Sequence, residues 1–412
     1  MLVKVLLALT IIIIAARVMG MLFRRLDQPA VIGEVIGGIL LGPSLFGRIA
    51  PDTAAFLLPA EAAPFLSIIS QLGVILYMFL VGLELDLGVL RTRARATLAI
   101  STASIVAPFT LGIALASGLY QAYAPAAVRF IPFALFFGVS LSITAFPVLA
   151  RILGDHGLQR TPMGVLALTC AAINDAIAWC LLAFVVGVTE ATTGGAITTI
   201  GLTAVYIGLM LTVGRRLMAR AVPRLDASIT VGEQSLTLVL VAVLLSAVAT
   251  EFIGVHAIFG AFLLGAIIPH GSAIARHVRE RIEDVVRVML LPAFFAFTGL
   301  RTEIGLMLGL DDWLMCLLII AVASAGKFGG ATLAARIAGL DWRDSAALGI
   351  LMNTRGLVEL IVLNIGLDLG VLSPRLFTML VVMAIVTTIM TSPILMSLLR
   401  KRPWVEPARQ SA

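Results

Sequence analysis

The chain has 412 residues, of which 60% are hydrophobic and only 13% are charged, and its mean hydropathy is +1.09. Soluble domains carry about a quarter charged residues, so this composition excludes an ordinary soluble protein. Repeated apolar runs of about 20 residues are typical of a helical membrane protein, because lipid offers the backbone no other hydrogen-bond partner. The net charge of +6 does not indicate nucleic-acid binding, because the basic residues lie in the connections between the apolar runs.

Polar, glycine-rich or arginine-rich segments divide the chain into thirteen apolar spans, which predicts an all-α polytopic membrane protein. The first span is expected to be retained, since no small-residue cleavage site follows it. The second and ninth spans are short for a bilayer and are expected to be tilted or only partly embedded. The expected limits are 3–23, 31–47, 64–83, 96–118, 131–151, 162–188, 195–217, 232–251, 254–269, 285–300, 312–338, 344–370 and 374–399.

The basic residues indicate the orientation of the spans. Of the 29 Lys and Arg residues, 21 lie in one set of alternate connections, 5 lie in the other set, and the rest lie within spans. The set rich in arginine is cytoplasmic by the positive-inside rule. We therefore expect the N-terminus outside and a short tail at 403–412 in the cytoplasm, with no cytosolic regulatory domain attached to this chain.

Two pairs of segments suggest an internal repeat. GGILLG at 37–42 resembles GAFLLG at 260–265, and FLVGLELDLG at 79–88 resembles AFTGLRTEIG at 296–305. The members of each pair are an odd number of spans apart, so the two copies run in opposite directions through the membrane. This pattern predicts an inverted-topology transporter, in which span 195–217 links two six-span repeats.

The fifth and sixth spans carry polar groups near their middle. In SLSITAFP, Ser142 and Thr144 precede Pro147, whose missing N–H disrupts the helix. The sixth span places Asp175 about 20 Å along a helix that starts at residue 162, near the bilayer centre, with Asn174 beside it. An ionised carboxylate at that depth costs from about 2.5 to more than 10 kcal/mol, so Asp175 needs a partner or a function.

The eleventh and twelfth spans carry the other polar groups at this depth. SAGKFGG places Lys327 in the middle of the eleventh span, and MNTRGLVEL interrupts the twelfth. We expect spans five and twelve to be discontinuous helices that cross at their breaks. Arg355 and Glu359 would neutralise the helix ends there, or form a purely structural i,i+4 pair. The polar residues of the second break are Asn353, Thr354, Arg355 and Glu359.

Asp175 could be balanced by a dehydrated monovalent cation, by a proton or by Lys327. Competition between a cation and a proton for one carboxylate is the chemistry of antiport. Asn174, Thr144 and Ser142, with backbone carbonyls, could complete an oxygen shell for a cation at Asp175. The alternative is a structural ion pair between Asp175 and Lys327 that stabilises the helix bundle.

Several long motifs resemble the monovalent cation:proton antiporter-2 family, which includes the Kef-type potassium efflux systems and the plant cation/H⁺ exchangers. The resemblance covers nearly the whole membrane domain. The motifs are GEVIGGILLGPSLFG (33–47), LSITAFPVLARIL (141–153), AAINDAIAW (171–179), HAIFGAFLLGAIIP (256–269) and LGILMNTRGLVELIVLNIGLDLG (348–370).

The resemblance implies a homodimer in a lipid membrane, expected to be a bacterial inner membrane, with an elevator-like displacement of a mobile core. The transmembrane domain would be 1–402, with the core at 96–188 and 312–400 and the dimerisation scaffold at 1–90 and 232–300. The residue matching Asp175 is the carrier in this family, and the residue matching Lys327 is the membrane lysine. Many members have two aspartates where this chain has Asn174 and Asp175, so Lys327 lacks its usual partner and is expected to turn to Asp175.

The sequence therefore predicts a secondary active antiporter that exchanges Na⁺ or K⁺ for H⁺ and contributes to pH homeostasis, without a cofactor or a nucleic-acid partner. The alternative is a Kef-like potassium channel, which would pass ions without proton exchange. An enzyme is not expected, because the chain has no HExxH, GxSxG or nucleotide-binding loop. The transport stoichiometry stays open, since it depends on whether Lys327 also loses a proton when the cation binds.

Overall fold

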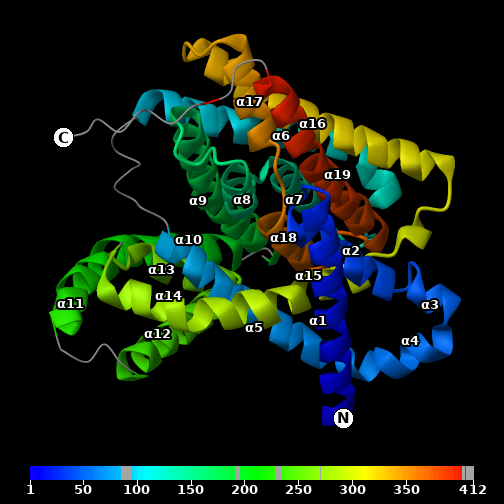
Figure 1. Cartoon of the computed structure of the whole chain (residues 1–412), viewed down its shortest axis with the longest axis horizontal. Coiled ribbons are helices and arrows are strands. Elements are labelled where there is room, and N and C mark those ends of the chain that lie inside the picture. Colours follow the sequence, from blue (N-terminus) through cyan, green and yellow to red (C-terminus); the bar gives the residue numbers. More distant parts are fainter. Residues whose placement is uncertain (85–93, 191–194, 228–232, 270, 401–403, 405–412) are drawn as a thin grey trace. The chain divides into compact units, whose positions relative to one another are not determined.

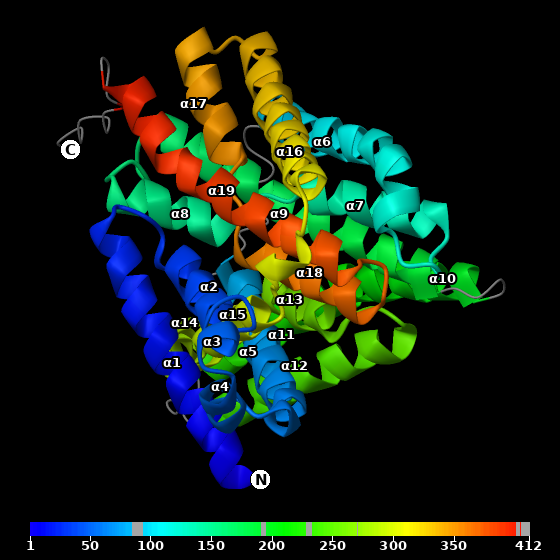
Figure 2. The ribbon, with the colours of Figure 1, turned by 90° about the vertical axis from the view of Figure 1, so that its right-hand side faces the viewer.

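The computed structural model describes residues 1–84, 94–190, 195–227, 233–269, 271–400 and 404, and these residues form helices and connecting turns without strands (Figures 1 and 2). Eleven of the described helices are long and apolar enough to cross a membrane, or twelve if one bent pair counts as a span. A further apolar helix, α13 (Ala257–Ile267), is shorter. These elements correspond to the thirteen predicted spans. The predicted tail, apart from Trp404, and residues 85–88 of the repeat lie outside the described residues.

The chain divides into two compact units. The first comprises Met1–Ile13, Phe56–Gly88 and Ala183–Phe297, and the second comprises Ile14–Ala55, Val89–Leu182 and Thr298–Ala412. Most of the predicted core belongs to the second unit, together with residues 14–55 of the predicted scaffold. Their roles as mobile core and scaffold stay a prediction. Four helices contribute residues to both units: α1 (Leu2–Arg25), α4 (Pro51–Leu57), α9 (Pro162–Glu190) and α15 (Leu291–Leu300).

The first unit is held together by close contacts between small residues. Gly82 on α5 and Gly265 on α13 face each other, because a Cβ on either would lie 2.3 Å from a carbonyl oxygen of the other helix. Such glycines let membrane helices approach closely. The helix α13 contacts both α5 and α12. The other elements are η1 (Ala60–Ala62), α5 (Ala63–Glu84), α10 (Gly195–Leu209), the π-helical turn η3 (Met210–Gly214), α11 (Arg215–Ala227), α12 (Glu233–Ile253), α14 (Ala273–Val285) and the π-helical turn η4 (Val286–Leu290).

In the second unit, α16 runs beside α6 and also contacts α17 and α19 (Figure 2). Gly326 and Gly330 of α16, one turn apart, pack on the backbone of α6 at Pro108 and Ala103, which is a small-residue interface. The elements of this unit are α2 (Ala30–Leu41), α3 (Phe46–Ile49), α6 (Ala94–Tyr123), α7 (Phe130–Ser142), α8 (Phe146–Asp155), η5 (Ile304–Leu306), α16 (Leu310–Ile337), α17 (Trp342–Met352), α18 (Leu357–Asp368) and α19 (Pro374–Leu399).

A buried carboxylate ties three helix ends of the second unit together. Asp312, in the first turn of α16, accepts hydrogen bonds from the Tyr123 hydroxyl (3.0 Å), the Leu308 N–H (3.1 Å) and Arg375. The Arg375 guanidinium also lies over the Tyr123 ring, 5.2 Å from its centroid. These contacts fix the ends of α6, α16 and α19, the helices that surround the broken helices described next.

Candidate functional site

The predicted breaks in spans five and twelve are confirmed. The helix α7 ends at Ser142 and α8 begins at Phe146, so Pro147 lies in the first turn of the new helix, where its missing N–H costs nothing. The helices α17 and α18 are separated by residues 353–356 and are bent by 43°. The backbone is extended at Ile143 in the first break, with ψ 138°, and at Gly356 in the second.

The two breaks contact each other directly. The N–H of Ala145 donates to the carbonyl of Thr354 at 3.0 Å, and the Thr144 hydroxyl donates to the carbonyl of Met352 at 3.0 Å. On the other side, Thr388 of α19 accepts from the Arg355 N–H at 3.0 Å and donates to the Arg355 carbonyl at 2.8 Å. The polar backbone groups that the breaks free are therefore partnered inside the protein, as a low-dielectric environment requires.

Asp175 is buried in α9 with an exposed fraction of 2%. Neither carboxylate oxygen has a side-chain hydrogen-bond partner among the described residues. The backbone N–H of Phe146, at the start of α8, is directed at the carboxylate, and the ammonium of Lys327 is a nearby positive charge. A buried carboxylate without a side-chain partner is unusual, because such groups are normally paired or protonated. The site therefore presents a carboxylate with acceptor capacity to spare in the interior of a membrane protein.

The neighbours of Asn174 determine which way its amide points. Its Nδ2 donates to the hydroxyls of Ser104 (2.7 Å) and Thr144 (3.1 Å). Each hydroxyl already donates its own hydrogen to a backbone carbonyl. The Ser104 hydroxyl donates to Ser101 at 2.9 Å, and the Thr144 hydroxyl donates to Met352. Towards Asn174, both hydroxyls can therefore only accept. The amide oxygen must therefore point away from them. It is buried without a partner among the described residues, on the residue next to Asp175.

Lys327 is fully buried in α16, and its Nζ donates to the Thr144 hydroxyl at 2.5 Å. Among the described residues, no salt bridge within 4.0 Å joins Lys327 to Asp175. The expected turn of Lys327 towards Asp175 is therefore not found in this structure. The ammonium donates instead to the hydroxyl of Thr144, which lies in the break of span five.

Arg355 and Glu359 form the predicted i,i+4 pair, with Arg355 Nη1 2.9 Å from Glu359 Oε2 and both side chains fully buried. Arg355 also donates to the carbonyls of Ser140 (2.8 Å) and Leu141 (2.6 Å), which lie in the last turn of α7. The guanidinium therefore links the two broken helices, and its positive charge faces a helix C-terminus, where it is stabilised.

The other predicted site residues have separate partners. Ser142 donates to the carbonyl of Val139 at 2.9 Å, within its own helix. Asn353 donates to Ser324 at 3.4 Å, and its Oδ1 has no partner among the described residues. The Thr354 hydroxyl is likewise buried and unpartnered among them.

The hydroxyl of Thr144 accepts hydrogen bonds from Asn174 and Lys327 and donates one to Met352. These three bonds leave it no free lone pair for a cation.

Two residues of this site, Ser104 and Thr388, were not predicted. Both lie in apolar spans that also contain other serines and threonines, and such residues often bond only to their own helix. A hydroxyl near the middle of a span is the one signal that the sequence offers for them.

The described residues contain no group of three or more His, Cys, Asp or Glu that could hold a resident metal ion.

A sequence profile described as "Sodium/hydrogen exchanger, transmembrane" matches residues 9–401. The chain belongs to this family. The predicted resemblance is thus confirmed, and the exchanger is an integral membrane protein.

Curated relatives of the exchanger have names that agree with this family. The exchanger is 47% identical to the Na(+)/H(+) antiporter NhaS4 of Synechocystis sp. over 390 residues, which are 94% of this chain and 95% of the relative. It is 39% identical to Cation/H(+) antiporter 17 of Arabidopsis thaliana, covering 95% of this chain and 48% of that one. It is 34% identical to K(+)/H(+) antiporter 1 of Saccharomyces cerevisiae, covering 93% and 45%. The chain therefore spans about half the length of these plant and yeast relatives.

A solved structure shows the same fold at low sequence identity. The sodium proton antiporter MjNhaP1 from Methanocaldococcus jannaschii matches the exchanger with a TM-score of 0.70 and 12% identity, covering 96% of this chain and 97% of that one. At this identity the match supports the fold alone, and it agrees with the predicted antiporter fold.

Proposed function

We propose that the exchanger is a secondary active antiporter that moves Na⁺ or K⁺ in one direction and H⁺ in the other, with Asp175 binding each in turn. The observation that carries this proposal is the buried Asp175 carboxylate, which is 2% exposed and has no side-chain partner among the described residues. The names of relatives that cover nearly all of this chain support the exchange of a monovalent cation for a proton.

The two substrates exclude each other at this site for an electrostatic reason. An anionic Asp175 inside the membrane needs a positive charge close by, because its desolvation costs several kcal/mol. Lys327 is hydrogen-bonded to Thr144 instead. A cation bound by Asp175 and the Asn174 oxygen, or a proton on Asp175, neutralises the site, whereas both together leave an excess positive charge.

Alternating access requires that the site be exposed to one side of the membrane at a time. We infer an elevator-like displacement of the second unit, whose two broken helices are hydrogen-bonded to each other and can move together. The proposal includes a homodimer in a bacterial cytoplasmic membrane, with the N-terminus outside and the C-terminus inside, as the arginine distribution indicates. In this account Asn174 is a cation ligand, and Arg355 and Glu359 hold the breaks together.

The proposal is tested in proteoliposomes that contain a trapped pH-sensitive dye. Adding Na⁺ or K⁺ outside imposes an inward cation gradient and is expected to alkalinise the lumen, because each cation that enters drives a proton out. Asp175→Asn removes the titratable group at nearly constant volume and is expected to abolish this signal. Asp311→Asn, an exposed acid in the first turn of α16, is the matched control and is expected to retain it.

Exchange that survives in folded Asp175→Asn protein would contradict the proposed role of this carboxylate. Cation uptake by the wild type without any movement of protons would instead indicate the Kef-like channel. Comparing Na⁺, K⁺ and Li⁺ in the same assay identifies the transported cation.

A further inference from the structure

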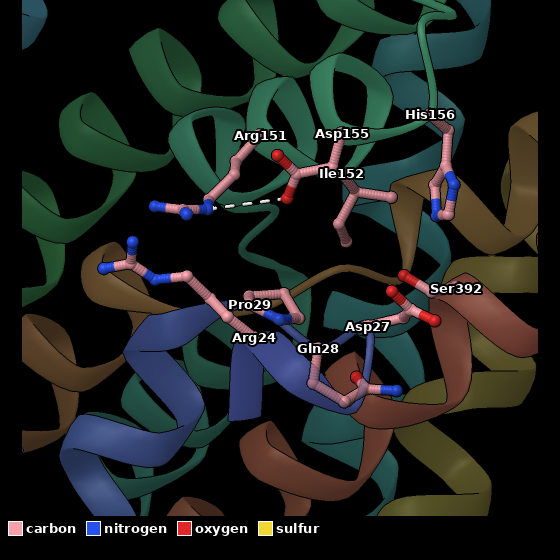
Figure 3. Close-up of a pocket in the computed structure, with 9 residues that line it drawn as sticks. All are labelled: Arg24, Asp27, Gln28, Pro29, Arg151, Ile152, Asp155, His156 and Ser392. Atoms are coloured by element: carbon pink, nitrogen blue, oxygen red, sulfur yellow. Dashed lines mark ion pairs between the residues drawn. The ribbon is translucent and has the colours of Figure 1, made fainter. Parts of the chain in front are cut away.

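A cavity of about 230 Å³ lies in the second unit, apart from the site at Asp175. Figure 3 shows its charged lining. The guanidinium groups of Arg24, in the last turn of α1, and Arg151, on α8, lie on one side of the cavity. Asp27, in the turn after α1, and Ser392, on α19, lie on the opposite side. Two guanidinium groups therefore lie at one end of the cavity, with the Asp155 carboxylate beside Arg151, and the Asp27 carboxylate lies at the other end; His156 also lines the cavity.

The charges at the two ends are only partly neutralised by described residues, since the buried Glu34 carboxylate acts on both Arg24 and Arg151 without a salt bridge to either. Arg24 and Asp27 form no salt bridge with each other or with another described residue, although they line the same cavity. Arg151 has a single ion pair with Asp155, at a long 3.6 Å from its Nε. Arginine guanidinium groups that converge on one space are the usual means of holding a phosphate.

The anionic end also offers hydrogen-bond acceptors. Gln28 lines the cavity, and its Oε1 is buried without a partner among the described residues. A buried acceptor without a donor costs about 1–3 kcal/mol, so it indicates a missing donor group. With the Asp27 carboxylate and the Ser392 hydroxyl, it forms an acceptor set that suits a primary ammonium, which brings three N–H donors.

The size of the cavity limits the ligand. Pockets for drug-sized molecules measure about 300–1,000 Å³, so about 230 Å³ is too small for a nucleotide. Among the described residues, the lining has no Phe, Tyr or Trp side chain, and its aromatic ring is the imidazole of His156. A small zwitterion with phosphate and ammonium groups a few bonds apart fits both the volume and the charge arrangement.

The position of the cavity favours a lipid as the source of this zwitterion. Arg24 and Asp155 lie at the ends of α1 and α8, and Ser392 lies two turns before the end of α19. Helix ends that follow long apolar runs lie at the depth of the lipid headgroups, and basic pockets between such helices bind headgroups.

We propose that this cavity binds the phosphoethanolamine headgroup of a membrane lipid, with the phosphate at Arg24 and Arg151 and the ammonium at Asp27, Gln28 and Ser392. The binding site is independent of the transported cation, because none of these residues belongs to the site at Asp175. A phosphatidylethanolamine seated here contacts the C-terminal end of α8, whose N-terminal end faces Asp175.

The test uses the full chain, purified in detergent and stripped of lipid, with binding measured by titration in native mass spectrometry. The probes are dioleoyl-phosphatidylethanolamine, dioleoyl-phosphatidylglycerol, dioleoyl-phosphatidylcholine, free phosphoethanolamine and inorganic phosphate. Phosphatidylethanolamine is expected to bind most tightly, because phosphatidylglycerol lacks the ammonium and phosphatidylcholine has no N–H to donate.

The variants separate the two ends of the cavity. Arg24→Gln and Arg151→Gln are each expected to weaken phosphatidylethanolamine binding about tenfold, the loss expected for one charge-assisted hydrogen bond. Asp27→Asn is expected to remove the preference over phosphatidylglycerol, and Asn tolerates the positive φ of 53° at this position. Arg25→Gln removes a neighbouring exposed charge that does not line the cavity, so it is expected to bind as the wild type does.

Equal binding of the three lipids by the wild type would overturn the proposal, as would wild-type affinity in the Arg24 and Arg151 variants. If either arginine variant fails to fold, the lipid preference of Asp27→Asn decides the question. Free phosphoethanolamine that binds as tightly as the lipid would overturn the assignment to a membrane lipid.

Discussion

Lys327 donates a hydrogen bond to the Thr144 hydroxyl at 2.5 Å, and no salt bridge among the described residues joins it to Asp175. This arrangement bears on the charge moved in each transport cycle. If the lysine were paired with Asp175, an incoming cation would displace it and could release its proton. Because Lys327 is held by Thr144, the cation has only the proton of Asp175 to displace. We therefore expect one cation to move for one proton.

Exchange by the wild type should be insensitive to membrane potential. In proteoliposomes clamped with K⁺ and valinomycin, the rate of Na⁺-driven pH change is expected to be the same at zero and at negative potential. Asn174→Asp places a second carboxylate beside Thr144, where it can pair with Lys327, and should make the rate depend on potential. A wild-type rate that changes with potential would rule out the one-to-one exchange.

Ser104 is expected to control cation affinity through Asn174. Ser104→Ala removes an acceptor for the Asn174 amide N–H. The amide oxygen is then no longer held in the direction that points away from Ser104 and Thr144. An unsatisfied buried N–H costs about 1–3 kcal/mol, so the half-saturating cation concentration should rise roughly 5- to 150-fold. The control is Ser101→Ala, whose hydroxyl bonds to the Cys170 carbonyl and does not contact Asn174. Equal cation dependence in Ser104→Ala and the wild type would exclude this role.

Arg355 should be essential for stability. Arg355→Met leaves Glu359 as an unpaired buried charge and removes the donors of the Ser140 and Leu141 carbonyls. Removing one partner of a buried ion pair costs about 3–5 kcal/mol, so thermal unfolding in detergent should shift to clearly lower temperature. The double variant Arg355→Met with Glu359→Leu should recover part of the loss. A single variant as stable as the wild type would show that the pair is dispensable.

The contact between α16 and α6 predicts that two glycine-to-alanine changes affect the stability of the protein differently. A Cβ at Gly326 would lie 2.7 Å from the Pro108 Cα, whereas a Cβ at Gly329 meets nothing within 4 Å. Gly326→Ala should therefore cost about 1–3 kcal/mol by overpacking. Gly329→Ala should be neutral or gain up to about 1 kcal/mol from helix propensity. The melting temperatures of both variants test this, and equal effects would contradict the described packing.

The sequence was sufficient where a local rule determines the structure. Pro147 cannot donate to the helix ladder, so the break before it followed from covalent chemistry. The spacing of Arg355 and Glu359 placed them on one helix face, where the structure shows them paired. The depth of Asp175 in the membrane was estimated from the rise per residue and stays a prediction, while its side chain is buried in the protein.

The sequence was insufficient where a side chain chooses between partners far apart in the chain. Lys327 and Thr144 are separated by 183 positions, and no periodicity indicates which acceptor a buried ammonium reaches. Ser104 lies in a helix with several other hydroxyl residues, so its contact with Asn174 depends on how α6 and α9 are turned. The cavity between Arg24 and Arg151 likewise forms only once helix ends from three segments meet. These features depend on tertiary packing, which the apolar pattern does not specify.

The central claim, that a cation and a proton compete for Asp175, is tested most directly by measuring proton release on cation binding. Purified protein in weakly buffered detergent solution, at a pH where Asp175 is protonated, is titrated with Na⁺ or K⁺, and the released protons are counted with a pH indicator. About one proton per chain is expected at saturation, and none from Asp175→Asn. Cation binding without proton release by the wild type, or the same release from Asp175→Asn, would contradict it.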